Sequence, residues 1–106
     1  MNYYQLLHSD TAVQNGIVNQ PKSMQVIKNL QDLLDVLRAL EQLLDVEVIV
    51  NSGYRTPELN RLVGGVSDSL HMYGLAADIK VENTAKVKDK KSIDYLLFSI
   101  LHLIQR

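Results

Sequence analysis

The feature that most constrains this fold is a long amphipathic segment over residues 21–44, PKSMQVIKNLQDLLDVLRALEQLL. Its apolar residues recur at steps of three, four and seven, and charged residues fall between them. This period is that of an α-helix with one apolar face. We expect a helix of about six turns with Pro21 in its first turn. Its core-facing residues would be Ile27, Leu30, Leu34, Leu37 and Leu44. The alternative is one helix of a coiled-coil dimer, but packing on a small sheet is favoured.

Alternating residues predict two β-strands after this helix. In VEVIVNS (46–52), the valines alternate with other residues, and Gly53 marks a turn at the end. In LAADIKV (75–81), the alternation separates two faces. One face would carry Ala77, Ile79 and Val81, and the other would carry Ala76, Asp78 and Lys80. Asp78 is therefore expected in the middle of a strand.

Capping residues predict two short helices. Residues 8–16 combine Ser9, a possible N-cap, with Gly16, a possible stop. Residues 56–65 have an N-cap, a proline at the first helical position and a terminating glycine: Thr56, Pro57 and Gly64.

The C-terminal part is predicted to be a polar loop followed by a helix. Residues 82–91 are polar, and the Lys-rich part 86–91 is interpreted as solvated surface. In residues 92–106, apolar residues follow one another at steps of three and one, which favour a helix. The expected fold class is α+β, with helices packed on a small antiparallel sheet in a single domain over 1–106.

Composition excludes several classes of protein. The chain has 106 residues and a net charge of −1, so it has no electrostatic footprint for nucleic acid. It has no cysteine, which excludes disulfides and cysteine-based metal or nucleophile sites. No apolar run approaches the roughly 20 residues of a membrane-spanning helix. The N-terminus has no signal-peptide pattern, so we expect a protein that is cytoplasmic as synthesised, with release to the cell wall if it derives from a phage.

The stretch SLHMYGLAADI (69–79) contains two candidate functional residues, a histidine and an aspartate. His71 would lie on a loop and Asp78 on the next strand, with Gly74 allowing the chain to turn between them. A carboxylate among apolar neighbours needs a partner or a metal, and zinc binds both imidazole nitrogen and carboxylate oxygen. From these two residues alone, a hydrogen bond that locks a turn is the favoured interpretation.

The residues around this pair resemble a known family. The chain carries Ser52-Gly53-Tyr54-Arg55, and later an S-x-H-x-x-G-x-A-x-D box over 69–78. These two motifs, with the linker LNRLVGG between them, are similar to the zinc D-alanyl-D-alanine carboxypeptidases. That family includes phage and bacterial peptidoglycan peptidases and the dipeptidases of vancomycin resistance. The resemblance covers nearly the whole chain and implies a compact, hedgehog-like α+β domain.

The resemblance implies roles for individual residues. His71 and Asp78 match the first two zinc ligands, and Arg55 matches the arginine that steadies the substrate or the oxyanion. A guanidinium suits this because it is always charged and presents fixed donors. Tyr54 is expected in the wall of the cleft. Ser69 would either line the substrate pocket or cap a turn.

The family also carries a downstream strand that ends in E-x-x-H, with a general-base Glu and a third zinc ligand. No Glu follows Glu82 here, and the remaining histidine is His102. Two interpretations stay open. Either SILH takes the place of E-x-x-H, with His102 as third ligand and Ser99 replacing the Glu, or residues 92–105 form a helix that precedes the missing strand. The helical period favours the second, in which His102 is a surface residue and the domain lacks its C-terminal strands.

The resemblance therefore implies a zinc-dependent peptidase that acts on peptidoglycan stem peptides and is impaired by the missing Glu. The alternatives are a binding protein that holds the peptide without cutting it, and a remnant whose open sheet edge supports a homodimer. Four tyrosines are expected to be half-buried packing residues rather than sugar-stacking platforms. They are Tyr3, Tyr4, Tyr73 and Tyr95.

Overall fold

The computed structural model describes residues 1–83 and 96–99. Its helices are α1 (Tyr4–Leu7), α2 (Asp10–Gln14), α3 (Met24–Leu44), α4 (Pro57–Leu62) and the 3-10 helix η1 (Leu70–Tyr73). Its strands are β1 (Val46–Ser52), β2 (Asp78–Asn83) and β3 (Leu96–Ser99). The α+β class predicted from the sequence is confirmed.

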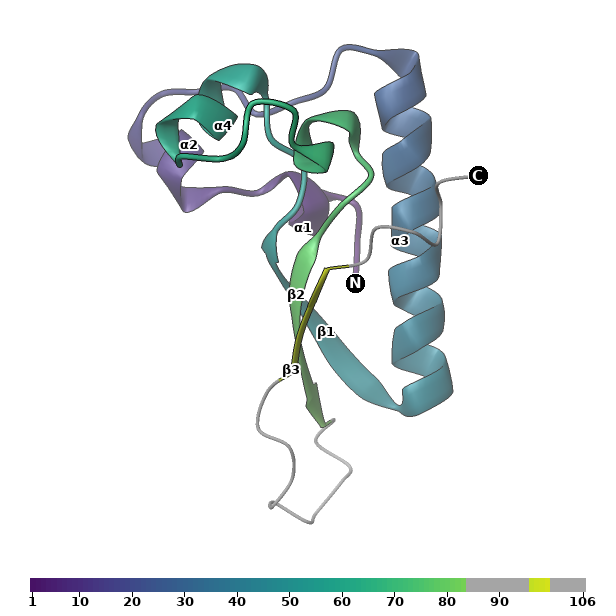
Figure 1. Ribbon diagram of the computed structural model, residues 1–106. Helices are drawn as coiled ribbons and strands as arrows, with labels where there is room; N and C mark the ends of the chain where they lie inside the picture. The colour runs from purple at the N-terminus through teal and green to yellow at the C-terminus, as the bar shows by residue number, and fades with distance from the viewer. Residues whose placement is uncertain (84–95, 100–106) are drawn as a thin grey trace.

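The strands form one antiparallel sheet in the order β1-β2-β3. Val48 pairs with Val81, and the register shifts between Val50 and Ser52, so Ser52 comes opposite Asp78. Helix α3 runs along the sheet, whereas α1, α2 and α4 gather at the end of β1 where it leaves the sheet (Figure 1). This arrangement collects the short helices around the turn that follows β1.

Within the described residues, helix α3 contributes more residues to the buried core cluster than any other element. Leu30, Leu33 and Leu37 are completely buried and pack against the inner faces of β1 and β2. Two details of the prediction are wrong. The helix begins at Met24 after an N-cap at Ser23, so Pro21 precedes it. Leu44 is 60% exposed, because it lies in the last turn, where the chain reverses direction through the left-handed Asp45 into β1.

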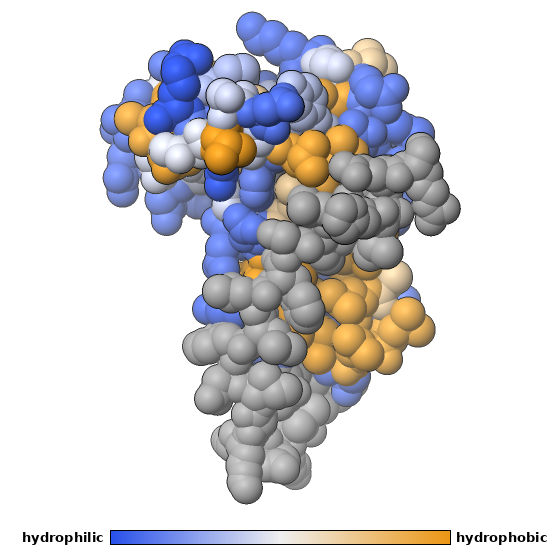
Figure 2. Space-filling view, in the orientation of Figure 1, coloured by the Kyte–Doolittle hydropathy of each residue, from blue (hydrophilic) through white to orange (hydrophobic). Residues whose placement is uncertain are grey.

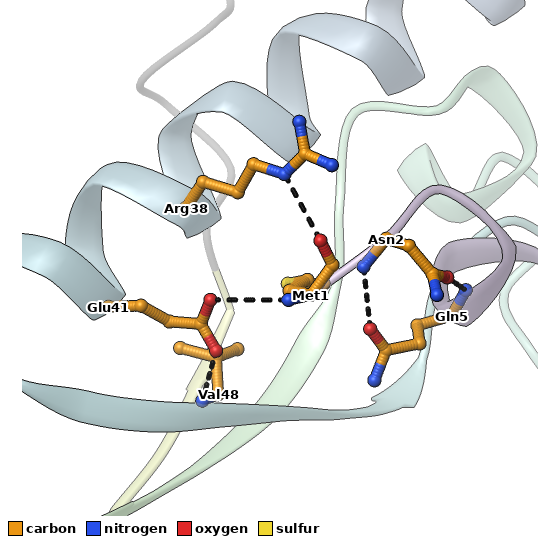
Figure 3. A network of polar contacts seen from close by, with 6 residues as sticks. All are labelled: Met1, Asn2, Gln5, Arg38, Glu41 and Val48. Carbon is orange, nitrogen blue, oxygen red and sulfur yellow. Dashed lines mark hydrogen bonds and ion pairs between the residues drawn. The ribbon is translucent and has the colours of Figure 1, made fainter. Parts of the chain in front are cut away.

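The amino-terminal residue is tied to α3 and β1 (Figure 3). The α-amino group of Met1 lies 3.6 Å from Oε1 of Glu41, and Oε2 of Glu41 accepts a hydrogen bond from the backbone N–H of Val48 at 3.0 Å. Nε of Arg38 donates to the carbonyl oxygen of Met1 at 3.1 Å. Glu41 thus connects three segments that are distant in the sequence.

The predicted short helices form where their caps place them. The side chain of Ser9 accepts from the N–H of Ala12 at the start of α2, and Thr56 accepts from Leu59 at the start of α4. Gly16 and Gly64 follow these helices with φ of +67° and +76°. Only glycine adopts such angles readily, so both helices end there.

The predicted C-terminal helix is wrong over residues 96–99, which form β3. Short apolar runs do not distinguish helix from strand by period alone. Here the edge of β2 offers backbone partners, and antiparallel pairing from Val81–Leu96 to Asp78–Ser99 satisfies them. The rest of that segment, with His102 and the Lys-rich residues 86–91, lies outside the described residues.

Apolar side chains gather on one part of the surface, over the lower half of α3 as seen in Figure 2. Leu43 and Leu44 at the end of this helix are among the exposed large apolar residues. Within the described part of the chain, no helix is both long and apolar enough to cross a membrane. A homodimer through an open sheet edge stays a prediction.

Candidate metal and substrate site

The SGYR turn after β1 is held against α1 by backbone contacts. The N–H of Tyr54 donates to the carbonyl oxygen of Leu6 at 2.8 Å, and the N–H of Arg55 donates to that of His71 at 3.1 Å. A Cβ on Gly53 would lie 2.3 Å from the Leu6 oxygen. No side chain fits in that space, so the turn requires glycine at this position.

Asn19 fixes the turn from the other side. Its Nδ2 donates to the carbonyl oxygens of Leu7 and Tyr54 at 2.8 and 2.9 Å, and its Oδ1 accepts from the N–H of Thr56 at 2.9 Å. The side chain is buried. A buried amide with three backbone partners rigidifies the loop that carries Arg55.

His71 lies in η1, and its ring is oriented by the SGYR turn. Nδ1 is 2.7 Å from the carbonyl oxygen of Gly53. A carbonyl only accepts hydrogen bonds, so Nδ1 carries the proton and Nε2 is left to face another group. Ser69 caps η1 by accepting from the N–H of His71 at 3.2 Å, and Gly74 ends it with φ of +73°. The capping alternative for Ser69 is thereby confirmed.

Asp78 faces that free nitrogen. Its Oδ2 is 3.3 Å from Nε2 of His71, and 42% of its side chain is exposed. Asp78 is the first residue of β2 and not a mid-strand residue as predicted, because this segment begins to pair with β1 only at Asp78, opposite Ser52. The motif spacing therefore brings His71 and Asp78 together at the end of the sheet.

This pair is suited to hold a cation. When a neutral imidazole turns its unprotonated Nε2 toward a carboxylate, a lone pair of the nitrogen faces a lone pair of the oxygen. This contact is favourable only if a proton or a metal ion lies between the two atoms. Zinc ligands lie about 2.0–2.2 Å from the ion in tetrahedral sites, so two of them are roughly 3.3–3.6 Å apart. The separation of 3.3 Å fits that geometry. Within residues 1–83 and 96–99, no group of three potential ligands is present.

A sequence model of the Peptidase M15 family matches residues 1–94. The chain belongs to this family. Peptidases of the M15 family are generally zinc-dependent, which agrees with the donor atoms of His71 and Asp78. No curated protein and no solved structure matches the chain.

Arg55, the M15 arginine predicted from the SGYR motif, is held by two neutral side chains. Its Nε donates to Oγ of Ser52 at 3.2 Å, and its Nη1 donates to Oδ1 of Asn60 at 3.0 Å. Neither partner neutralises the positive charge, so the guanidinium can still attract an anion. Arg55 lines a pocket of about 230 Å³ together with Ser52 and Gly53.

Asn60 is a residue whose role sequence reasoning missed. It is buried in α4, and its Nδ2 donates to the carbonyl oxygen of Val66 at 2.8 Å. A Cβ on Gly65 would lie 2.0 Å from Asn60 Oδ1 and 2.8 Å from Arg55 Nη1. The signal in the sequence was the glycine pair Gly64-Gly65 shortly after Asn60. A glycine often marks a point where the backbone passes close to another group.

The remaining predicted site residues have different positions. Tyr54 is only 7% exposed and belongs mainly to the hydrophobic core, although it also contributes to the pocket at Arg55. Burial raises the pKa of its phenol. The backbone of Ser99 is the register partner of Asp78, and His102 lies outside the described residues. The substrate-binding roles of Tyr54 and Ser69 stay predictions.

Proposed function

We propose that this chain is a zinc peptidase that acts on the stem peptides of peptidoglycan. One observation carries the zinc part of the proposal. Nδ1 of His71 is fixed by Gly53, while Nε2 is 3.3 Å from the carboxylate of Asp78. A hydrogen bond on the distal ring nitrogen is the usual arrangement of a metal-binding histidine. The peptidoglycan part rests on the resemblance of the two motifs to peptidoglycan peptidases.

His102 is the proposed third ligand. The register of β3 with β2 brings Ser99 opposite Asp78, so the chain leaves β3 at the end of the sheet where the pair lies. Three residues of chain span at most about 10 Å. A histidine three positions after Ser99 is therefore within reach of the His71–Asp78 pair. This register supports the interpretation in which SILH takes the place of E-x-x-H.

A zinc ion bound to these residues would supply an activated water and polarise the scissile carbonyl. The chain's own part is to hold the substrate. Arg55, oriented by Ser52 and Asn60, would bind a peptide carboxylate or the developing oxyanion. The contact from the N–H of Arg55 to the carbonyl oxygen of His71 keeps the arginine backbone at a constant position relative to the imidazole.

A second function is favoured by the identity of residue 99. With Ser99 in place of the general-base Glu, proton removal from the attacking water lacks a base worth about 10²–10⁴-fold in rate. The domain would then bind zinc and stem peptide but hydrolyse slowly. Peptide retention on a muropeptide column without product formation is the result expected from this second function.

Zinc stoichiometry of the purified full chain tests the proposal. We expect about one zinc ion per chain by elemental analysis, in line with a single three-ligand site. Zinc should be lost in His71→Ala and His102→Ala and retained in the matched control His8→Ala, whose exposed imidazole pairs with Asp10. Equal zinc in the parent and in His71→Ala would contradict the proposal.

A further inference from the structure

A polar groove lies on the side of β1 that faces the short N-terminal helices, and the proposed peptidase activity does not use it. Its volume is about 700 Å³, within the roughly 300–1,000 Å³ range of pockets that hold small ligands. The N-terminal segment forms one wall and the second half of β1 forms the other. We call it the N-terminal groove. Its polar and aromatic lining includes Asn2, Tyr4, Gln5, His8, Asp10 and Asn51.

Tyr4 is the most unusual residue of this groove. It was expected to be a half-buried packing residue, but it is 74% exposed. The ring of Tyr3 meets it edge to face, with centroids 6.5 Å apart and planes at 70°. Tyr3 itself packs against the core. Tyr4 therefore offers a largely exposed aromatic ring at the groove, in contact with a second ring that packs against the core, and is a candidate stacking platform.

The polar residues are oriented by contacts within the N-terminal segment. The amide oxygens of Asn2 and Gln5 accept hydrogen bonds from each other's backbone N–H at 3.3 and 2.7 Å (Figure 3). Because both bonds use the oxygens, the amide NH₂ groups remain as donors. Nε2 of His8 is 2.8 Å from Oδ1 of Asp10. The groove thus combines oriented donors and acceptors with little net charge.

This combination matches a sugar better than other ligand classes. A pyranose ring has an apolar C–H face that stacks on an aromatic ring, and hydroxyls that need both donors and acceptors. A nucleic acid or a phosphate would need cations, and the polar lining residues here include no lysine or arginine. We propose that the N-terminal groove binds an oligosaccharide, with Tyr4 stacking on one ring.

The groove adjoins the pocket at Arg55. His8, Ser9, Thr11 and Asn51 line both hollows. A ligand made of sugar rings with a peptide branch could therefore occupy both at once, with the sugar on Tyr4 and the peptide toward Arg55. That connection rests on the proposed function, whereas sugar binding in the groove does not require zinc or hydrolysis.

Titration of the full chain with chitotetraose, followed by amide chemical shifts, tests the proposal with and without zinc. We expect shifts confined to residues 2–11 and 49–55, of equal size in both conditions. Tyr4→Ala should weaken binding about tenfold, a change equivalent to about 1.4 kcal/mol, while Tyr4→Phe should bind as the parent does. Met24→Ala, at an exposed residue outside the groove, is the matched control and should also bind as the parent does.

Three results would overturn the proposal: no shifts in the groove at saturating sugar, unchanged affinity in Tyr4→Ala, or shifts produced by a stem tetrapeptide and not by the sugar. Because the titration does not depend on zinc, its outcome is separate from that of the zinc stoichiometry. Sugar binding in a protein that binds no zinc would leave the groove proposal intact and remove the peptidase proposal.

Discussion

Nδ1 of His71 lies 2.7 Å from the carbonyl oxygen of Gly53, a contact between two residues that are 18 positions apart in the sequence and belong to different motifs. It joins the SGYR turn to the histidine of the S-x-H-x-x-G-x-A-x-D box. The hydrogen bond from the backbone N–H of Arg55 to the carbonyl oxygen of His71 joins the same two motifs. The turn that carries the proposed substrate-binding arginine thus also orients the proposed metal ligand.

Zinc binding should weaken as the pH falls. Metal ligands must be deprotonated, so protons compete with zinc for Nε2 of His71 and Oδ2 of Asp78, the two atoms of the proposed site that lie 3.3 Å apart. We expect the apparent zinc affinity to fall by about tenfold per pH unit for each proton that zinc displaces. Competition with a chromophoric chelator between pH 8 and pH 5 measures this. A pH-independent affinity would show that zinc binds elsewhere.

Replacement of Ser99 by Glu should increase peptide hydrolysis. The backbone of Ser99 is opposite Asp78, and a carboxylate introduced there could act as the general base. General-base catalysis contributes about 10²–10⁴-fold, so we expect Ser99→Glu to raise turnover of a D-Ala-D-Ala peptide at least about 10²-fold. Ser99→Gln, which has the same size and no base, should behave as the parent. Similar rates in both variants would separate Ser99 from the chemistry.

Two leucines of α3 should respond differently to truncation. Leu33 is 0% exposed, and Leu44 is 60% exposed. Leu33→Ala should lower the free energy of unfolding by about 2–5 kcal/mol, because it removes buried methyl groups and leaves a cavity. Leu44→Ala should change it by less than about 0.5 kcal/mol. Urea unfolding followed by circular dichroism compares them, and equal losses would place Leu44 in the core after all.

Loss of Asn60 should destabilise the loop that holds Arg55. Asn60→Ala removes the acceptor of Arg55 Nη1 and the donor to the carbonyl oxygen of Val66. Buried polar groups left without partners cost about 1–3 kcal/mol. Asn15→Ala is the control, since Asn15 is exposed and its amide bonds only within its own turn. Chemical denaturation should show the loss in Asn60→Ala alone.

Alkaline pH should destabilise the fold in part through Tyr54. Burial raises the pKa of this phenol above its ordinary value of 10.0. Above that value the unfolded chain releases the proton while the folded chain retains it, so stability falls as the pH rises through 10 and is unaffected at neutral pH. Tyr54→Phe should reduce this decline. Thermal melts of both proteins between pH 7 and pH 11 measure the difference; parallel curves would contradict the assignment.

Features of the structure that depend on neighbouring residues could be predicted from the sequence. The caps Ser9 and Thr56, the stops Gly16 and Gly64, and the apolar period of α3 were recognised because each depends on residues within a few positions. His71 and Asp78 were also singled out from the sequence, but their types and spacing alone favoured a hydrogen bond that locks a turn, and the proposed metal role came from the resemblance to the zinc carboxypeptidases. For these features the interactions that decide the structure lie within one or two turns of chain.

The tertiary structure decided what depends on partners distant in the sequence. Residues 96–99 form a strand because the edge of β2 offers backbone partners, although their apolar pattern favours a helix. Asn19 and Asn60 are important because the loops they bond come together only in the fold. Tyr4 is exposed beside a groove because Tyr3, and not Tyr4, packs against the core. Side-chain burial and long-range pairing are properties of the assembled chain, and no local pattern specifies them.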